Sequence, residues 1–188
     1  MKTLIIYANP DNDNRSIANK IIVEQLLKSK NIEIRKLYSL YPDFKINVDA
    51  EQKALVEADI LILQFPLHWY SVPGLLKEWL DKVFLHGFAY GSGGDNLHGK
   101  EFIVSTTVGG DLDSYCASGH NHFTIDELLK PIQQTALFTG MKFNKPIISY
   151  DMVYLNNGSE QKIAIERRAK QHATELIVRL NNLKTEKM

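Results

Sequence analysis

Residues 65–79, FPLHWYSVPGLLKEW, join the end of an apolar run to the start of an amphipathic pattern. The preceding run, Asp59 to Gln64, is typical of a buried strand, and Gly74 to Phe84 carries apolar residues at helical spacing. A proline at each end of the intervening loop keeps it out of helical geometry. The pattern predicts a strand, a loop and a helix, which is the repeating unit of a parallel α/β sheet.

The loop in this unit carries two adjacent aromatic residues, Trp69 and Tyr70. In an open α/β sheet, ligands bind at the edge where the parallel strands end, and large rigid rings there form a wall for a flat aromatic ligand. The alternative is ordinary strand-to-helix packing, with Trp69 buried in the core. The other loops on the same edge are needed to decide between the two.

Strand and helix patterns alternate along the whole chain. Apolar or alternating runs predict five strands, at Thr3–Ala8, Ile32–Leu37, Asp59–Phe65, Phe102–Thr107 and Pro146–Tyr150. Helical spacing, with Gly140 and Ser159 as capping residues, predicts helices at Ser16–Lys28, Ala50–Glu57, Gly74–Phe84, Thr124–Thr139 and Ser159–Leu183. Right-handed crossovers then favour an α/β fold, a flavodoxin-like three-layer sandwich whose five-stranded parallel sheet has the order 2-1-3-4-5.

Composition is typical of one globular domain over residues 1–188, with 44% hydrophobic residues. Lysines plus arginines equal aspartates plus glutamates at 22 each, so no overall field attracts nucleic acid or an anionic membrane. A single cysteine, Cys116, excludes internal disulfides and suits a reducing compartment. The apolar run Leu4–Tyr7 is too short for a secretory signal, so we expect a cytoplasmic location.

The loop from Asn9 to Ser16 leads into a helix whose first turn offers free backbone N–H groups, a ready anion site. The Ser16 hydroxyl and Arg15 suit a phosphate, although Asp11 and Asp13 argue against a heavily charged ligand close to them. The alternative is that Ser16 caps the helix and Arg15 is solvated. The loop lacks the Gly-x-x-x-x-Gly-Lys and Gly-x-Gly-x-x-Gly motifs, so a kinase or a standard dehydrogenase is not expected.

Residues 106–110, TTVGG, end the fourth predicted strand with two hydroxyls and two glycines, which let backbone N–H groups approach a ligand or simply form a tight turn. Tyr115, His120 and His122 follow, and a tyrosine and a histidine there are suited to donate hydrogen bonds to an oxygen that gains charge. Alternate histidines also suit a metal, but no nearby Cys or Glu completes a ligand set, so no metal site is expected.

Taken together, these motifs resemble the flavodoxin-fold NAD(P)H:quinone oxidoreductases of the diaphorase type. The resemblance rests on YANP at 7–10 with SIAN at 16–19, PLHWYSVP at 66–73 with LDKVF at 80–84, GFAYG at 87–91, and TTVGG at 106–110 with Tyr115. Residues 37–44 and 97–100 are most similar to the ancillary quinone reductase of glutathione-regulated potassium efflux systems and to its general stress protein relatives.

The resemblance implies a homodimer with one flavin per subunit, FMN rather than FAD because relatives that hold FAD tend to be longer. The implied reaction is two-electron hydride transfer from NADPH or NADH through the flavin to a quinone, in a ping-pong cycle. Three alternatives remain open. They are a regulatory flavin-binding subunit that docks on a potassium efflux transporter, a one-electron carrier like flavodoxin, and an azo or nitro reductase.

The resemblance also implies site residues. The flavin phosphate is expected to lie against Asn9, Ser16, Ile17, Ala18 and Asn19. The isoalloxazine ring is expected to contact Pro66, Leu67, His68, Trp69 and Tyr70, and its polar edge Thr107, Val108, Gly109 and Gly110. Tyr115 and His122, with His120 as the alternative, are expected to stabilise charge on the reduced ring. The chain departs from the usual pattern at Asn9, His68 and Val108, where the family commonly has histidine, glutamine and threonine.

Overall fold

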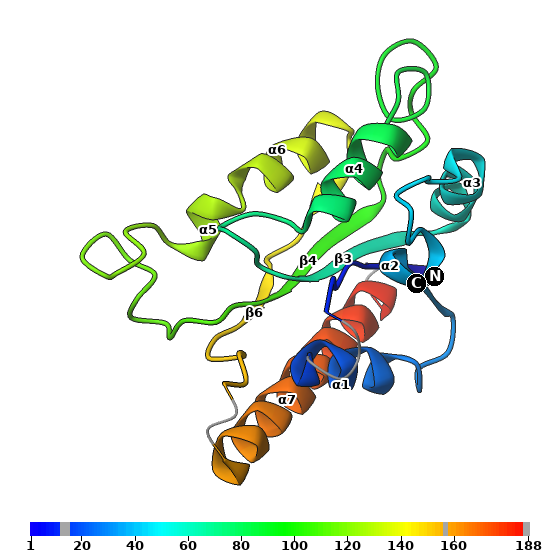
Figure 1. The fold of residues 1–188 in the computed structure, drawn as a ribbon. Coiled ribbons are helices and arrows are strands. Elements are labelled where there is room, and N and C mark those ends of the chain that lie inside the picture. Colours follow the sequence, from blue (N-terminus) through cyan, green and yellow to red (C-terminus); the bar gives the residue numbers. More distant parts are fainter. Residues whose placement is uncertain (12–15, 156–157, 186–188) are drawn as a thin grey trace.

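The computed structural model describes residues 1–11, 16–155 and 158–185, so the roles expected of Asp13 and Arg15 lie outside the described residues. A parallel sheet runs through the centre in the order β2-β1-β3-β4-β5, with β6 also paired to β4 (Figure 1). The strands are β1 Thr3–Tyr7, β2 Ile32–Lys36, β3 Ile60–Pro66, β4 Glu101–Thr107, β5 Lys142–Phe143 and β6 Ile147–Ser149. The predicted order 2-1-3-4-5 is confirmed.

Helices cover both faces of this sheet (Figure 1). They are α1 Ile17–Leu26, α2 Leu37–Leu40, α3 Val48–Glu57, α4 Gly74–Val83, α5 Ile125–Leu128, α6 Lys130–Phe138 and α7 Ser159–Thr185. Successive strand residues point to opposite faces, so Leu4 and Ile6 pack with α2 to α6, whereas Ile5 packs with α1 and α7. Apolar runs without alternation therefore serve two cores, and the predicted three-layer α/β sandwich is confirmed.

The strand pattern changes character on the α1 and α7 face near the carboxyl ends of the strands. Ile60 and Ile62 of β3 are followed on this face by Gln64, and Ile103 of β4 is followed by Ser105. Both polar side chains are fully buried and lie opposite each other in the β3–β4 register. One face of an otherwise apolar sheet thus ends in polar groups next to the sheet edge where ligands are expected.

The single helix predicted over Thr124–Thr139 is wrong, because the chain forms two helices, α5 and α6. Thr124 and Glu127 form a reciprocal capping box at the start of α5. Pro131 lies in the first turn of α6, where its missing N–H does no harm, but it could not continue a helix from α5. The predicted left-handed cap at Gly140 is confirmed by a φ of 71°.

The fifth predicted strand, Pro146–Tyr150, is shorter than expected and forms as β6. The place beside β4 in the sheet is shared between β5 and β6. β5 pairs with the start of β4 and β6 with its end, and Pro146, which has no N–H for the ladder, lies between them. The helix α2, directly after β2, was not predicted, because four residues are too few to display a helical period.

A buried carboxylate links two helices to the edge strand β2, on the opposite side of the sheet from β5. Glu51 of α3 is fully buried and accepts hydrogen bonds from Tyr41 Oη at 2.5 Å and Trp79 Nε1 at 2.9 Å. It also pairs with the Arg35 guanidinium at 2.6 Å, and this partner raises the pKa of Arg35. The group joins β2, α3 and α4 through one charged centre.

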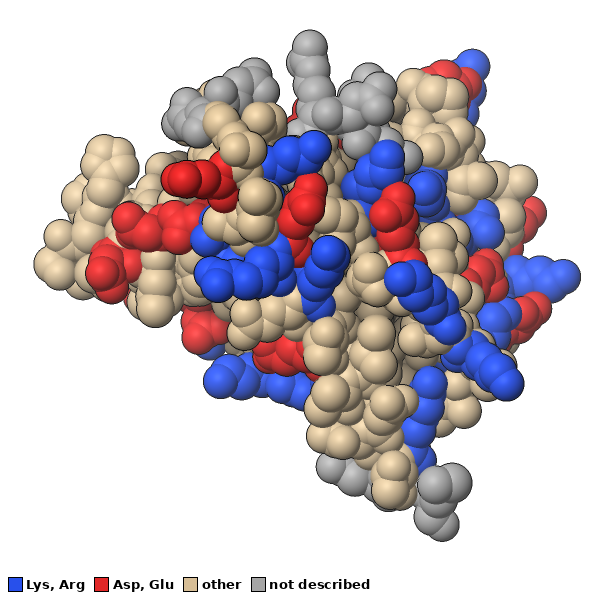
Figure 2. Space-filling model, turned by 90° about the horizontal axis from the view of Figure 1, so that it is seen from below, with Lys and Arg blue, Asp and Glu red and all other residues tan. Residues whose placement is uncertain are grey.

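The surface carries both signs of charge throughout the face built by α1 and α7. Figure 2 shows lysines and arginines interleaved with aspartates and glutamates on this side of the molecule. No broad surface of one sign forms there, in keeping with the equal totals of basic and acidic residues in the sequence. Within residues 1–11, 16–155 and 158–185, no helix is both long and apolar enough to cross a bilayer.

Candidate functional site

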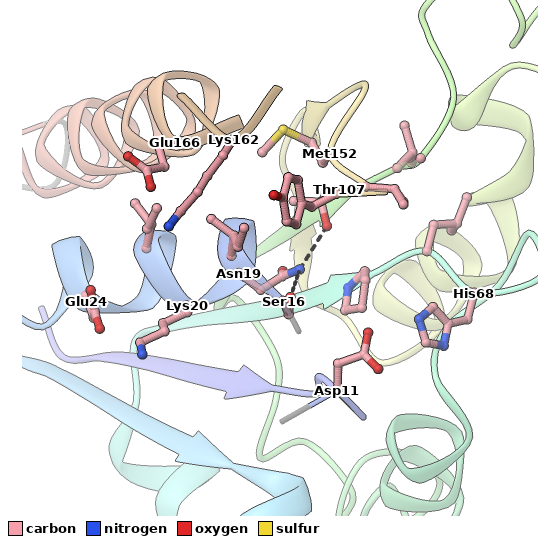
Figure 3. A pocket seen from close by; sticks show the side chains of 18 residues that line it. Asp11, Ser16, Asn19, Lys20, Glu24, His68, Thr107, Met152, Lys162 and Glu166 are labelled. Atoms are coloured by element: carbon pink, nitrogen blue, oxygen red, sulfur yellow. Dashed lines mark hydrogen bonds between the residues drawn. The ribbon is translucent and has the colours of Figure 1, made fainter. Parts of the chain in front are cut away.

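A cavity of about 880 Å³ opens at the carboxyl edge of the sheet, between α1, the ends of β3 and β4, and the start of α7 (Figure 3). Nine of the residues predicted for the site line it: Ser16, Ile17, Asn19, Pro66, Leu67, His68, Thr107, Val108 and Gly109. They come from three segments that are far apart in sequence, at the start of α1 and at the ends of β3 and β4, and the parallel topology brings all three to one edge.

Ser16 occupies the N-cap position of α1, but its side chain makes no capping hydrogen bond. Its Oγ instead accepts from Asn19 Nδ2 at 3.2 Å, and the same amide donates to Thr107 Oγ1 at 3.1 Å (Figure 3). The alternative that Ser16 serves only as a helix cap is therefore wrong. Asn19 holds the hydroxyls of two different loops side by side at the cavity wall.

Several cavity residues were missed by sequence reasoning. They are Lys20 and Glu24 of α1, Met152, Val153 and Tyr154 after β6, and Lys162 and Glu166 of α7. Lys20 lies one helical turn beyond Ser16, so the helical period was sufficient to predict that the two residues share a face. The α7 residues carried no such indication, because only the packing of α7 against α1 brings them to the cavity (Figures 1 and 3).

Trp69 and Tyr70 form the tip of a two-residue hairpin. His68 and Ser71 exchange two backbone hydrogen bonds of 2.9 Å, and φ is 46° at Trp69 and 63° at Tyr70. Positive φ at both central positions defines a type I′ turn, which normally selects Asn and Gly. The Trp69 side chain is 94% exposed, so the alternative that placed it in the core is wrong.

A second polar cluster adjoins the cavity beyond Gly109. Tyr70 Oη donates to Asn121 Oδ1 at 3.1 Å, and Asn121 Nδ2 donates to Ser114 Oγ at 3.0 Å. Gly110 faces this group so closely that a Cβ there would lie 2.7 Å from Ser114 Oγ and 3.1 Å from Tyr115 Cε2. Sequence reasoning noticed the histidines on either side of Asn121 but not Asn121 itself, which joins the two loops.

Tyr115 is half-buried against the core, with its ring centroid 6.0 Å from that of Tyr150. Burial raises the pKa of Tyr115, so its hydroxyl keeps its proton at neutral pH and can act as a donor. His120 and His122 are both exposed, and His122 adopts a left-handed backbone with φ of 62°. Their side chains do not line the cavity in this chain.

Two predicted phosphate residues lie apart from the cavity wall. Asn9 is buried, donates from Nδ2 to Tyr7 Oη at 3.1 Å, and lines a separate hollow of about 360 Å³. Ala18 packs into the core between α1 and α7. Among the residues that the structure describes, no three His, Cys, Asp or Glu side chains gather as a metal site would require.

Residues 1–176 match the family model described as flavodoxin-like fold. The chain is 50% identical, over 143 residues, to the glutathione-regulated potassium-efflux system ancillary protein KefF of Salmonella typhimurium, a match that covers 76% of this chain and 80% of that protein.

Two solved structures are similar over nearly their whole length. General stress protein 14 of Treponema denticola, solved in complex with FMN, gives a TM-score of 0.85 at 32% identity and covers 95% of this chain and 99% of that one. An NADPH-quinone reductase of P. pentosaceus gives a TM-score of 0.74 at 30% identity, covering 90% and 98%. With its sheet order, its cavity at the carboxyl edge and a match over residues 1–176, this chain belongs to the flavodoxin-like fold family.

Proposed function

We propose that this chain is an FMN-dependent NAD(P)H:quinone oxidoreductase. One observation carries the proposal: loops expected to hold a flavin meet around one cavity of about 880 Å³, in a chain 32% identical to a protein solved with FMN. The similarity to an NADPH-quinone reductase supports the choice of reaction. Cavities of this size, within the usual range of about 300 to 1,000 Å³, accept ligands as large as a flavin mononucleotide.

The residues present fit FMN. Ser16 and Thr107 present hydroxyls beside the first turn of α1, whose backbone N–H groups and dipole favour an anion such as a phosphate ester. Pro66 and Leu67 supply apolar wall for a flat ring. Charged residues of both signs line the cavity: Asp11, Glu24 and Glu166 are acidic, and Lys20 and Lys162 supply positive charge for an anionic group.

Bound FMN would supply hydride chemistry, accepting two electrons from NAD(P)H and passing them to a quinone. The chain's own contribution is to orient the ligands and to stabilise charge. The N–H groups of Gly109 and Gly110 and the protonated Tyr115 hydroxyl are proposed donors to a polar edge that gains negative charge. His122, with His120 as the alternative, is the proposed second donor.

Purified protein tests this function directly. We expect a yellow protein that releases FMN, identified by mass, and that oxidises NADPH or NADH in the presence of a quinone. Tyr115→Phe and His122→Ala should each slow flavin reduction in stopped-flow experiments by on the order of a hundredfold. A colourless protein that refuses added FMN would contradict the function, and unchanged rates in both variants would contradict only the assigned roles.

We further propose that the enzyme is a homodimer in the cytoplasm. Trp69 is 94% exposed on a turn next to the cavity, and Phe123 and Phe138 are also exposed. An apolar hollow of about 580 Å³ lies between α4 and α6, with Tyr90 and Phe138 at its rim. A second copy would cover such surface. Sedimentation at micromolar concentration should report twice the monomer mass, and a concentration-independent monomer would contradict the proposal.

A second candidate function is regulation of a potassium efflux transporter. The 50% identity to an ancillary protein of a glutathione-regulated potassium efflux system favours it. Both functions are compatible in one protein. Transport measured in vesicles with the cognate transporter should rise when the protein is added, and a variant that no longer binds FMN separates docking from catalysis. Absence of any effect on transport would restrict the chain to the enzymatic function.

A further inference from the structure

A buried titratable side chain outside the proposed chemistry, His172, lies on the α1 and α7 face of the sheet. It is 2% exposed and lies on the buried side of α7, at helical spacing from the core residues Ala169 and Leu176. An imidazole in such surroundings needs hydrogen-bond partners, because an unpaired buried polar group is costly. His172 has one on each ring nitrogen: Ser105 Oγ lies 2.7 Å from Nε2, and Ser149 Oγ lies 2.8 Å from Nδ1.

These contacts begin a chain of hydrogen bonds, here named the polar relay, formed by Ser149, His172, Ser105, Gln64 and Asn19. Ser105 Oγ donates to Gln64 Oε1 at 2.5 Å, and Gln64 Nε2 donates to Asn19 Oδ1 at 2.9 Å. All of its members except Ser149 are fully buried. The relay runs along the α1 and α7 face of the sheet, over the ends of β4 and β3, and ends at the cavity wall.

The direction of the relay follows from counting protons. Ser105 has one hydroxyl proton, and it is used on Gln64, so Ser105 Oγ can only accept from His172. Burial lowers the pKa of His172 to about 4, so at neutral pH the ring has a single N–H. That proton is therefore on Nε2, and Nδ1 accepts from Ser149.

The same count fixes the far end of the relay. Since Asn19 Oδ1 accepts from Gln64, its amide group faces the other way and gives its two protons to Ser16 Oγ and Thr107 Oγ1. Both hydroxyl oxygens thus accept from inside the protein, and each keeps its own proton to donate into the cavity. Two O–H donors side by side suit a ligand group that carries only acceptors, as a phosphate ester does.

We propose that His172 is a positioning residue of the cavity, which sets the direction of the polar relay and so holds the Ser16 and Thr107 hydroxyls as donors toward an anionic ligand. It acts through other residues and touches no ligand itself. Without the Nε2–H donor, nothing holds the relay in one direction, because amide and hydroxyl groups can each reverse their roles. This inference rests on the proposed function only in taking the anionic group to be the FMN phosphate.

The test compares FMN with riboflavin, which lacks the phosphate. The ratio of the riboflavin Kd to the FMN Kd isolates the phosphate contacts, and a general loss of packing does not change that ratio selectively. His172→Leu and Ser105→Ala should each lower the ratio about tenfold, because a hydrogen bond to a charged group loses its ordered donor. His172→Gln, which keeps an N–H at similar reach, should preserve most of the ratio.

Leu180→Ala is the matched control, since Leu180 lies in the same core on the same helix but outside the relay. It should lower the unfolding midpoint and leave the ratio unchanged. An unchanged ratio in His172→Leu would overturn the proposal. So would a fall of similar size in Leu180→Ala, which would indicate general loosening, or a fall in His172→Gln as large as in His172→Leu.

A second measurement does not depend on flavin binding. The ¹⁵N shifts of the His172 ring should report a neutral Nε2–H tautomer at neutral pH, and an Nδ1–H tautomer would overturn the proposed direction. If the wild-type protein binds neither FMN nor riboflavin, the proposed function fails, and the tautomer alone decides the relay.

Discussion

Tyr70 and Asn121 lie 51 residues apart in sequence, yet Tyr70 Oη donates a hydrogen bond to Asn121 Oδ1 at 3.1 Å. This bond ties the turn after β3 to the loop between β4 and α5. Asn121 is held in turn by Ser114, which neighbours the proposed donor Tyr115. The position of the Trp69–Tyr70 turn is thereby linked to the polar side of the site.

Removing the hydroxyl with Tyr70→Phe should loosen this link without unfolding the protein. Tyr70 is exposed, so we expect stability to fall by less than about 1 kcal/mol. Amides of residues 111–123 should exchange with solvent several-fold faster, as measured by hydrogen exchange mass spectrometry. Unchanged protection of that segment would show that the bond does not hold the loop.

The Trp69–Tyr70 turn stores backbone strain, and Trp69→Asn should release part of it. Asparagine tolerates positive φ far better than tryptophan, and the exposed indole leaves little packing to lose. We expect the free energy of unfolding to rise by about 1 kcal/mol, measured by urea denaturation. Quinone turnover should fall, because a proposed wall of the site is removed. A variant less stable than the wild type would contradict the backbone strain. Full quinone turnover in the variant would contradict the role of Trp69 in the site.

Gly110→Ala probes the space beside Tyr115. A Cβ at Gly110 would lie 2.7 Å from Ser114 Oγ and 3.1 Å from Tyr115 Cε2, so at least one of these side chains must move. We expect flavin reduction to slow by about tenfold or more, because small displacements of a donor are costly. Gly74→Ala is the control, since nothing lies within 4 Å of its Cβ. Equal rates of flavin reduction in the two variants would contradict the proposed role of Tyr115 as a donor.

Glu51→Gln should be the most destabilising of these changes. The carboxylate is fully buried, and its loss takes from the Arg35 guanidinium the nearer of its two carboxylate partners, leaving Glu33 at 3.5 Å. Breaking such a pair from one side costs about 3 to 5 kcal/mol, which chemical denaturation at neutral pH resolves. Glu57→Gln, which removes an exposed ion pair with Lys2, should change the midpoint far less. Similar midpoints for the two variants would contradict the argument that burial determines how much an ion pair contributes to stability.

Stability should depend on pH through His172. Burial lowers the pKa of His172 from 6.5 to about 4, so between these values the unfolded chain binds a proton that the folded protein does not. The free energy of unfolding therefore falls as pH drops through this window, by on the order of 3 kcal/mol once pH 4 is reached. Urea midpoints of wild type and His172→Gln between pH 7 and pH 5 test this, and the variant should show the shallower decline. Parallel curves would mean that the imidazole titrates normally.

Local patterns were sufficient for most of the elements and for much of the cavity. The apolar runs at β1, β3 and β4 and the spacing in α1 and α4 were predicted to within one or two residues, because each period is a property of neighbouring positions. Two predictions were wrong in detail: the single helix over Thr124–Thr139 and the length of the strand over Pro146–Tyr150. Both errors arose from giving too little weight to the missing N–H groups of Pro131 and Pro146.

What the sequence by itself determined is the α/β sandwich, its strand order and three loops that had to share one edge, because strand direction and the hand of the crossovers depend only on the order of elements. Only the tertiary structure decided that α7 completes the cavity with Lys162, that Asn121 joins two loops, and that His172 contacts Ser105. Those contacts join residues far apart in the chain, and no local period encodes which side chains meet when helices pack across a sheet.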